Sequence, residues 1–154
     1  MLKQRGVIMD KVNFVKLNKD AIVPTYGTAC SAGADLYTLP GDTIKVDPGE
    51  TVMIHTGIAM QIPDGTAAFI FARSGTATKR GLAPANKVGV IDSDYRGEIM
   101  VPIHNHSNVC QEIAGGERVA QMVIIPYIQA EFCECDSLNN TERADKGFGS
   151  TGTK

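Results

Sequence analysis

Residues 52–72 read VMIHTGIAMQIPDGTAAFIFA and contain the pattern that decides the fold. From 52 to 62 the even positions are mostly apolar and the odd positions are mixed, which is the period of two of a half-buried strand. The tripeptide Pro63-Asp64-Gly65 then favours a turn, and residues 67–72 form a compact apolar run of strand length. The stretch therefore predicts two strands, 52–62 and 67–72, joined by a tight connection.

The same alternation extends outward in both directions along the chain. Residues 44–46, 99–103 and 119–127 each have strand character, and the last run places Val119, Gln121 and Val123 on one face. Only one short helix is predicted, with Ser74 as its N-cap and Gly81 just past its end. Many short strands with tight turns and no long helix predict an all-β fold, a sandwich or jelly roll.

Composition limits what this chain does. The 154 residues have a mass of 16.4 kDa, 43% hydrophobic and 21% charged residues, and a formal net charge of -2. This is the size of one domain, and the charge disfavours nucleic-acid binding driven by bulk positive charge. No apolar run is long enough to span a membrane, and the start is too polar for a signal-peptide core. We therefore expect a cytoplasmic protein that starts at Met1 or Met9.

The cysteines and histidines do not predict a metal site. No two of the four cysteines have the spacing of a zinc knuckle, so buried or half-buried free thiols are expected. His104 and His106 share one face of a strand, but the sequence offers no third ligand nearby.

The chain changes character at about residue 137, which divides it into a β domain (1–136) and an arm (137–154). After Leu138 the only large apolar side chain is Phe148, too little for the arm to fold alone. The order of Thr153 and Lys154 excludes a P-loop, although the closely spaced glycines of 147–152 can wrap an anion. A frayed, solvated terminus is the alternative.

Three further clusters could carry chemistry. The hairpin tip of residues 89–97 contains Asp92, which directly follows an apolar run and is expected to be a partly desolvated base, or else a surface carboxylate of a turn. Arg73 and Ser74 at the start of the predicted helix suit a phosphate. Asp35, bracketed by small and apolar residues, is a weak candidate for binding a hard cation.

Taken together, five segments resemble the five ordered motifs of the trimeric deoxyuridine triphosphate nucleotidohydrolases (dUTPases). They are Ala32–Tyr37, Ala72–Gly75, Gly89–Gly97 with Asn86 upstream, Gly116–Met122, and Glu142-Arg143 followed by Gly147–Gly152. The resemblance implies a jelly-roll-like β subunit and a homotrimer whose three active sites draw motifs from all three chains. It also implies that the arm closes over a neighbouring subunit's site.

The implied reaction is Mg2+-assisted hydrolysis of dUTP to dUMP and pyrophosphate, which limits uracil in DNA and supplies dUMP for thymidylate synthesis. By resemblance, Asp92 orients and deprotonates the attacking water, and Asp35 holds Mg2+ through coordinated waters. The residues that grip the phosphates are implied to be Arg73, Ser74, Gly75 and Gln121, with Arg143, Ser150 and Thr151 on the terminal phosphates.

Base and sugar selection is assigned by the same resemblance. Tyr95 is implied to stack on the deoxyribose where a ribose 2′-hydroxyl would collide. The residues implied to contact the uracil are Asn86, Gly89, Val90, Ile91, Phe148 and Gly149.

Two other functions remain open from the sequence. One is a dCTP deaminase of the same superfamily, alone or bifunctional with dUTP hydrolysis. That branch typically has Arg-Ser-Ser where this chain has Arg73-Ser74-Gly75, so Gly75 and the complete fifth motif favour the dUTPase. A catalytically silent nucleotide-binding signalling protein would not need a water-activating carboxylate, so the presence of Asp35 and Asp92 argues against it.

Overall fold

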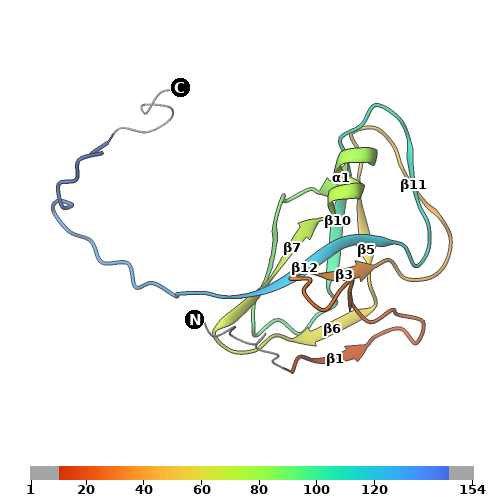
Figure 1. The fold of residues 1–154 in the computed structure, drawn as a ribbon, viewed down its shortest axis with the longest axis horizontal. Helices are drawn as coiled ribbons and strands as arrows, with labels where there is room; N and C mark the ends of the chain where they lie inside the picture. Colours follow the sequence, from red (N-terminus) through yellow and green to blue (C-terminus); the bar gives the residue numbers. More distant parts are fainter. Residues whose placement is uncertain (1–10, 146–154) are drawn as a thin grey trace, which may run out of the picture.

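The computed structural model describes residues 11–145, in which antiparallel strands surround one core (Figure 1). The largest sheet has five strands in the order β2-β3-β12-β7-β9. These strands are β2 (Thr25–Tyr26), β3 (Ala34–Tyr37), β12 (Arg118–Pro126), β7 (Thr66–Ala72) and β9 (Gly89–Ile91). Because β3 and β7 flank the long central strand β12, segments far apart in the sequence lie side by side there.

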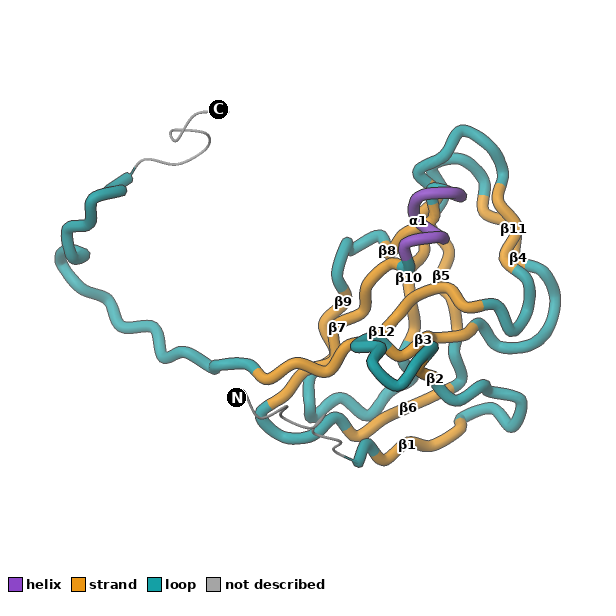
Figure 2. The backbone as a smooth tube through the Cα atoms, viewed as in Figure 1, coloured by secondary structure: helices purple, strands orange, loops and turns teal. Residues whose placement is uncertain are grey.

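The second sheet is three-stranded, and two strand pairs complete the subunit (Figure 2). The order of the second sheet is β5-β10-β8, and the pairs are β1-β6 and β11-β4. Their bounds are β5 (Thr51–His55), β10 (Met100–Asn105), β8 (Leu82–Pro84), β1 (Asn13–Lys16), β6 (Ile58–Gln61), β11 (Gln111–Ile113) and β4 (Ile44–Val46). The arrangement is jelly-roll-like and all-β, as the alternation predicts.

One apolar core holds the sheets together. Its members come from both main sheets and include Leu36, Ile54, Ile58, Ile70, Leu82, Val101, Ile103 and Met122, all at most 7% exposed. Burial of such side chains is the dominant favourable contribution to folding. Asp35 on β3 and Gln121 on β12 are polar residues of the large sheet that do not belong to this apolar core.

The prediction of one strand over 52–62 is wrong, because the chain turns at Thr56 and Gly57 and forms β5 and β6 instead. Gly57 has a φ of 68°, a conformation that favours glycine. The alternation survives the break because Thr56 stays buried, donating its hydroxyl to Ile99 O at 2.6 Å.

The strand predicted over 119–127 is present as β12, but the face packed on the core differs from the predicted one. Ala120 and Met122 are buried, whereas Gln121 and Val123 are only half-buried and face a cavity. A shift of register between Arg118 and Ala120 explains why Val119 does not share the face of Gln121.

The short helix α1 (Ser74–Arg80) confirms the predicted one with a changed cap. The N-cap is Arg73 rather than Ser74, and no side chain caps the helix by a hydrogen bond. Gly81 ends it in the left-handed conformation with a φ of 67°, as predicted. The side chain of Arg80 fixes the last turn, donating to Glu117 and to the carbonyl of Glu112.

After β12 the chain leaves the body of the subunit, as Figure 1 shows in blue. Residues 127–145 lie outside any strand or helix and are exposed, including Ile128 at 93% and Phe132 at 97%. The division at residue 137 stays a prediction.

The prediction that the cysteines are buried or half-buried is wrong. All four are free and exposed, because Cys30 and Cys110 lie in loops and Cys133 and Cys135 lie in the extension after β12. No helix within residues 11–145 is long and apolar enough to cross a membrane.

Candidate active site

A cavity of about 630 Å³ opens between β3, β12, the end of β7 and the start of α1. Of the residues assigned to a site from the sequence, the structure brings five together in its wall. They are Asp35, Arg73, Ser74, Gly75 and Gln121. The remaining wall is formed by Gly27, Ser31, Ala32, Gly33, Phe71, Arg118 and Val123.

The strand register places these side chains together. Gln121 lies opposite Asp35 on β3 and opposite Phe71 on β7, so one residue of the central strand faces both neighbours. Its amide Nε2 donates to Ala72 O at 2.9 Å, which holds the side chain at the end of β7. On the other side, Gly33 is so close that a Cβ there would lie 2.6 Å from Gln121 Oε1.

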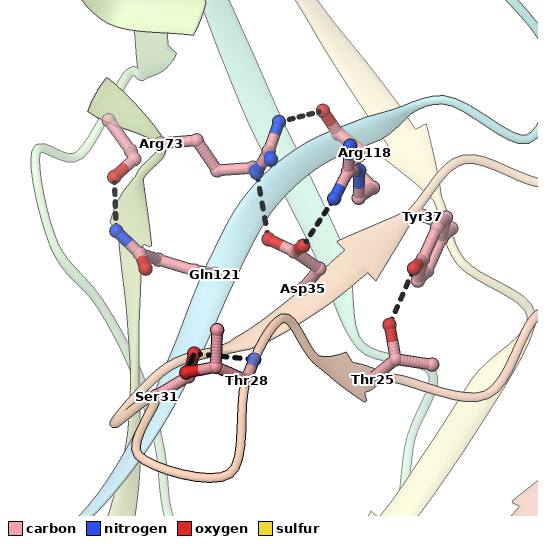
Figure 3. A network of polar contacts seen from close by, with 9 residues as sticks. Thr25, Thr28, Ser31, Asp35, Tyr37, Arg73, Arg118 and Gln121 are labelled. Atoms are coloured by element: carbon pink, nitrogen blue, oxygen red, sulfur yellow. Dashed lines mark hydrogen bonds and ion pairs between the residues drawn. The ribbon is translucent and has the colours of Figure 1, made fainter. Parts of the chain in front are cut away.

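Asp35 is the centre of a charged network in the wall (Figure 3). Arg73 Nε donates to Asp35 Oδ1 at 2.7 Å, and an Nη of Arg118 donates to Asp35 Oδ2 at 3.2 Å. The Asp35 side chain is only 12% exposed, so two guanidinium partners offset the cost of burying its charge. The three charged residues of the wall, one carboxylate and two guanidiniums, give the cavity a net charge of +1.

The start of α1 adds neutral hydrogen-bond donors beside this network. Arg73 accepts the first intrahelical bond, from the N–H of Ala77, so the N–H groups of Ser74 and Gly75 have no partner within the helix. The Ser74 residue is exposed and lies in the cavity wall. Backbone N–H groups, a hydroxyl and a guanidinium in one wall match the oxygen atoms of a phosphate.

The second group of predicted residues lies elsewhere in the same chain. These residues are Asn86, Gly89, Val90, Ile91, Asp92 and Tyr95, on β9 and the loops that flank it. β9 pairs with β7 so that Ile91 lies opposite Ala68, five residues before Arg73. At about 3.4 Å per residue, Asp92 is roughly 17 Å or more from Arg73 along the strand. One chain therefore holds two separate half-sites.

The prediction that Asp92 is partly desolvated is wrong for the single chain. Asp92 is exposed, because it follows the last residue of β9 and begins a turn that Tyr95 N closes by donating to Asp92 O at 3.2 Å. The apolar run before it belongs to β9, whereas Asp92 follows the end of that strand.

Tyr95 is held by its own loop. Its hydroxyl donates to Glu98 O at 3.0 Å, and its ring lies so close to Gly97 that a Cβ there would be 2.6 Å from the ring carbon Cζ. Glu98 in turn accepts from the N–H of Gly57 at 2.7 Å and bonds His55 Nδ1 at 2.9 Å. Burial raises the pKa of Glu98, but the hydrogen bonds from His55 and Gly57 and the charge of His55 outweigh burial and lower it.

Of the predicted residues of the arm, Arg143 alone lies within the described residues. Arg143 is exposed in the extension after β12. Phe148, Gly149, Ser150 and Thr151 lie outside the described residues.

No group of three metal-binding side chains exists within residues 11–145. His104, on β10, bonds Thr51 Oγ1 at 2.9 Å and packs edge-on against His106, which follows the end of the strand. Gly33 and Arg118 lie within the first and fourth motifs, but the sequence alone assigns neither of them a role. Their importance comes from contacts with Asp35 and Gln121, between residues more than 80 positions apart.

Comparison with known proteins matches this chain to one family. The family model described as dUTPase matches residues 19–152. A deoxyuridine 5'-triphosphate nucleotidohydrolase of Nautilia profundicola is 49% identical over 142 residues, which cover 92% of this chain and 99% of that protein. The corresponding protein of Desulfitobacterium hafniense is 46% identical over 143 residues, covering 92% and 95%.

Solved structures agree with the sequence relatives. A mutant dUTPase of Staphylococcus bacteriophage 80alpha, solved with dUpNHpp, superposes with a TM-score of 0.86 at 26% identity. That match covers 94% of this chain and all of the phage protein. The sequence motifs, the cavity and the matches together show that the chain belongs to the dUTPase family.

Proposed function

We propose that this protein hydrolyses dUTP to dUMP and pyrophosphate. The observation that carries the proposal is the cavity in which Asp35, Arg73, Ser74 and Gln121 meet, within a chain of the dUTPase family. Relatives 46–49% identical over nine-tenths of the chain are named for this activity. The dCTP deaminase alternative has no support from these matches.

The cavity is the triphosphate half of the site. Attack at the α-phosphorus requires the negative charge of the phosphates to be offset and the leaving pyrophosphate to be positioned. Arg73 supplies a charged fork, Ser74 a hydroxyl, Gly75 a backbone N–H and Gln121 an amide, all from the wall of one cavity. Ser74 stabilises the bridging oxygen that becomes the leaving group.

Dependence on Mg2+ is general in this family, and the residues of the cavity wall fit a Mg2+ ion that is held through its coordinated waters. Both oxygens of Asp35 already accept hydrogen bonds from guanidiniums, and no group of three metal-binding side chains is found within residues 11–145. These residues therefore suit an ion carried by the phosphates that keeps its waters, with Asp35 accepting from one of them through its remaining lone pairs. When bound, Mg2+ neutralises charge on the phosphate oxygens.

The water-activating half of the site comes from a neighbouring subunit. Asp92 is exposed and lies roughly 17 Å or more from Arg73 of its own chain, measured along β7. The two residues of one chain are therefore too far apart to act on the same phosphate group. A homotrimer, typical of the family, brings the Asp92 hairpin of one chain to the cavity of another. There Asp92 orients the water and accepts its proton.

The same hairpin selects base and sugar. The backbone of Gly89, Val90 and Ile91, together with Asn86, hydrogen-bonds the uracil edge, and the Tyr95 ring stacks on the deoxyribose. A cytosine would leave buried polar groups mispaired, which is a strong source of rejection. Arg143 with Ser150 and Thr151 holds the terminal phosphates, while Phe148 and Gly149 cover the uracil once the arm has closed.

The proposal is tested by pyrophosphate release measured side by side on dUTP, UTP, dTTP and dCTP, with and without Mg2+. We expect release from dUTP alone, and only with the metal. Ammonia release from dCTP, or no release from dUTP, would contradict the proposal.

A further inference from the structure

Strand β12 contains a bulge next to the cavity. Gln121 lies opposite Asp35 and Ala120 opposite Leu36, so a regular ladder would place Val119 opposite Tyr37. Instead Arg118 lies opposite Tyr37, and Val119 is the additional residue. Val119 and Ala120 are accordingly both buried, at 1% and 0% exposure. Bulges of this kind change the direction of a side chain and are common next to active sites.

The bulge determines which way Arg118 points. In a strand, successive side chains alternate between the two faces, so a regular β12 would send Arg118 to the face opposite Gln121. The additional residue reverses the alternation, and Arg118 shares the face of Tyr37, Asp35 and Gln121. Its side chain is 50% exposed and lies in the cavity wall (Figure 3).

From this position Arg118 holds both other charged residues of the wall. Its guanidinium donates to Asp35 Oδ2 at 3.2 Å, and its carbonyl oxygen accepts from an Nη of Arg73 at 3.4 Å. Asp35 Oδ1 accepts Arg73 Nε at 2.7 Å. The Arg73 guanidinium is therefore held at two of its nitrogens, Nε by Asp35 and one Nη by the backbone of Arg118, which leaves its remaining N–H groups for a ligand.

Removing the Arg118 side chain would change this arrangement without touching the backbone contact. Asp35 would lose one of its two cations, and its carboxylate would be free to rotate toward Arg73 alone. The net charge of the three-residue network would fall from +1 to zero, the less favourable value for an incoming triphosphate.

We propose that Arg118 is a positioning residue of the triphosphate site, which acts through Asp35 to orient the Arg73 guanidinium toward the phosphates. This inference rests on the proposed function and adds a residue to it. It also gives Asp35 a role as the shared counter-ion of two arginines.

The test compares affinities for dUpNHpp and dUMP in Arg118→Gln. We expect affinity for dUpNHpp to fall about tenfold, comparable to the loss of one charge-assisted hydrogen bond, while affinity for dUMP changes less than about twofold. Arg118→Lys keeps the charge and should fall between the wild type and Arg118→Gln. Equal losses for both ligands would indicate a merely structural residue, and no loss for dUpNHpp would likewise overturn the inference.

A double-mutant cycle checks that Arg118 acts through Asp35. In the background of Asp35→Asn, Arg118→Gln should weaken dUpNHpp binding by less than about twofold, because the two residues work as one unit. Independent losses that multiply would contradict the positioning role.

The matched control is Lys45→Gln, which removes one positive charge outside the cavity wall from a side chain 73% exposed. It should bind dUpNHpp with wild-type affinity. If Lys45→Gln loses as much affinity for dUpNHpp as Arg118→Gln does, the effect is due to the overall charge of the protein, and the inference is wrong. If the wild type and Lys45→Gln both fail to hydrolyse dUTP, the proposed function falls and this inference with it. If both are active and Arg118→Gln binds dUpNHpp normally, only this inference is wrong.

Discussion

Gly33 lies against the side chain of Gln121 so closely that a Cβ on Gly33 would be 2.6 Å from Gln121 Oε1 and 3.2 Å from Cδ. A side chain at position 33 would therefore have to displace the Gln121 amide. The amide of Gln121 is held between Gly33 and the carbonyl of Ala72.

Gly33→Ala should therefore push the Gln121 amide out of place. We expect the KM for dUTP to rise about fivefold, which corresponds to one hydrogen bond of roughly 1 kcal/mol. Gly27→Ala is the matched control, because Gly27 also lines the cavity and a Cβ there meets only Ser31 Oγ at an ordinary 3.7 Å. Steady-state kinetics on dUTP should show a raised KM for Gly33→Ala and a KM near that of the wild type for Gly27→Ala. An unchanged KM in Gly33→Ala would contradict the claim that Gly33 positions the Gln121 amide.

Tyr95→Ala should raise activity on UTP relative to dUTP. Without the ring, a ribose 2′-hydroxyl no longer collides, and we expect the ratio of kcat/KM for dUTP over UTP to fall about tenfold or more. Tyr95→Phe keeps the ring and loses only the bond to Glu98 O, so its ratio should stay near that of the wild type. A ratio unaffected by Tyr95→Ala would refute the role.

Glu98→Gln should destabilise the subunit in a pH-dependent way. The pKa of Glu98 is lowered in the folded state, so its ionised form stabilises the fold above the ordinary glutamate pKa of about 4.3. We expect Glu98→Gln to lose about 1–2 kcal/mol of unfolding free energy near pH 7, with a smaller difference as pH falls through the folded-state pKa. Denaturant unfolding at pH 7 and at a series of pH values descending from about 4.5 measures this, and a difference that does not shrink at the acid end of the series would contradict it.

Much of the β framework could be predicted because alternation reports a half-buried strand directly. The strands β4, β7 and β10 appear where residues 44–46, 67–72 and 99–103 predict them. The break at Gly57 could not be predicted, since Thr56 continues the buried face by bonding the carbonyl of Ile99, 43 residues away. The bulge at Val119 could not be predicted either, because it depends on how β12 pairs with β3, which is distant in the sequence.

The sequence predicts which residues belong to the candidate site better than it predicts how they contact one another. The motifs named Asp35, Arg73 and Gln121, and the structure places all three in one wall. Nothing local to the sequence reveals that Arg118 and Asp35 form an ion pair across 83 positions. The sequence leaves the exposure of Asp92 open, because an apolar strand before a residue says little about the turn after it.

The central claim is that the Asp92 hairpin of one subunit completes the cavity of another. It is tested most directly by coexpressing Asp92→Asn and Arg73→Ala chains with different affinity tags and purifying mixed oligomers. Each variant alone should have almost no dUTPase activity. If Asp92 and Arg73 of one site come from different chains, each mixed trimer contains one complete site of three, so the purified mixed trimers should have about one third of wild-type activity. Mixed oligomers as inactive as the single variants would contradict the account.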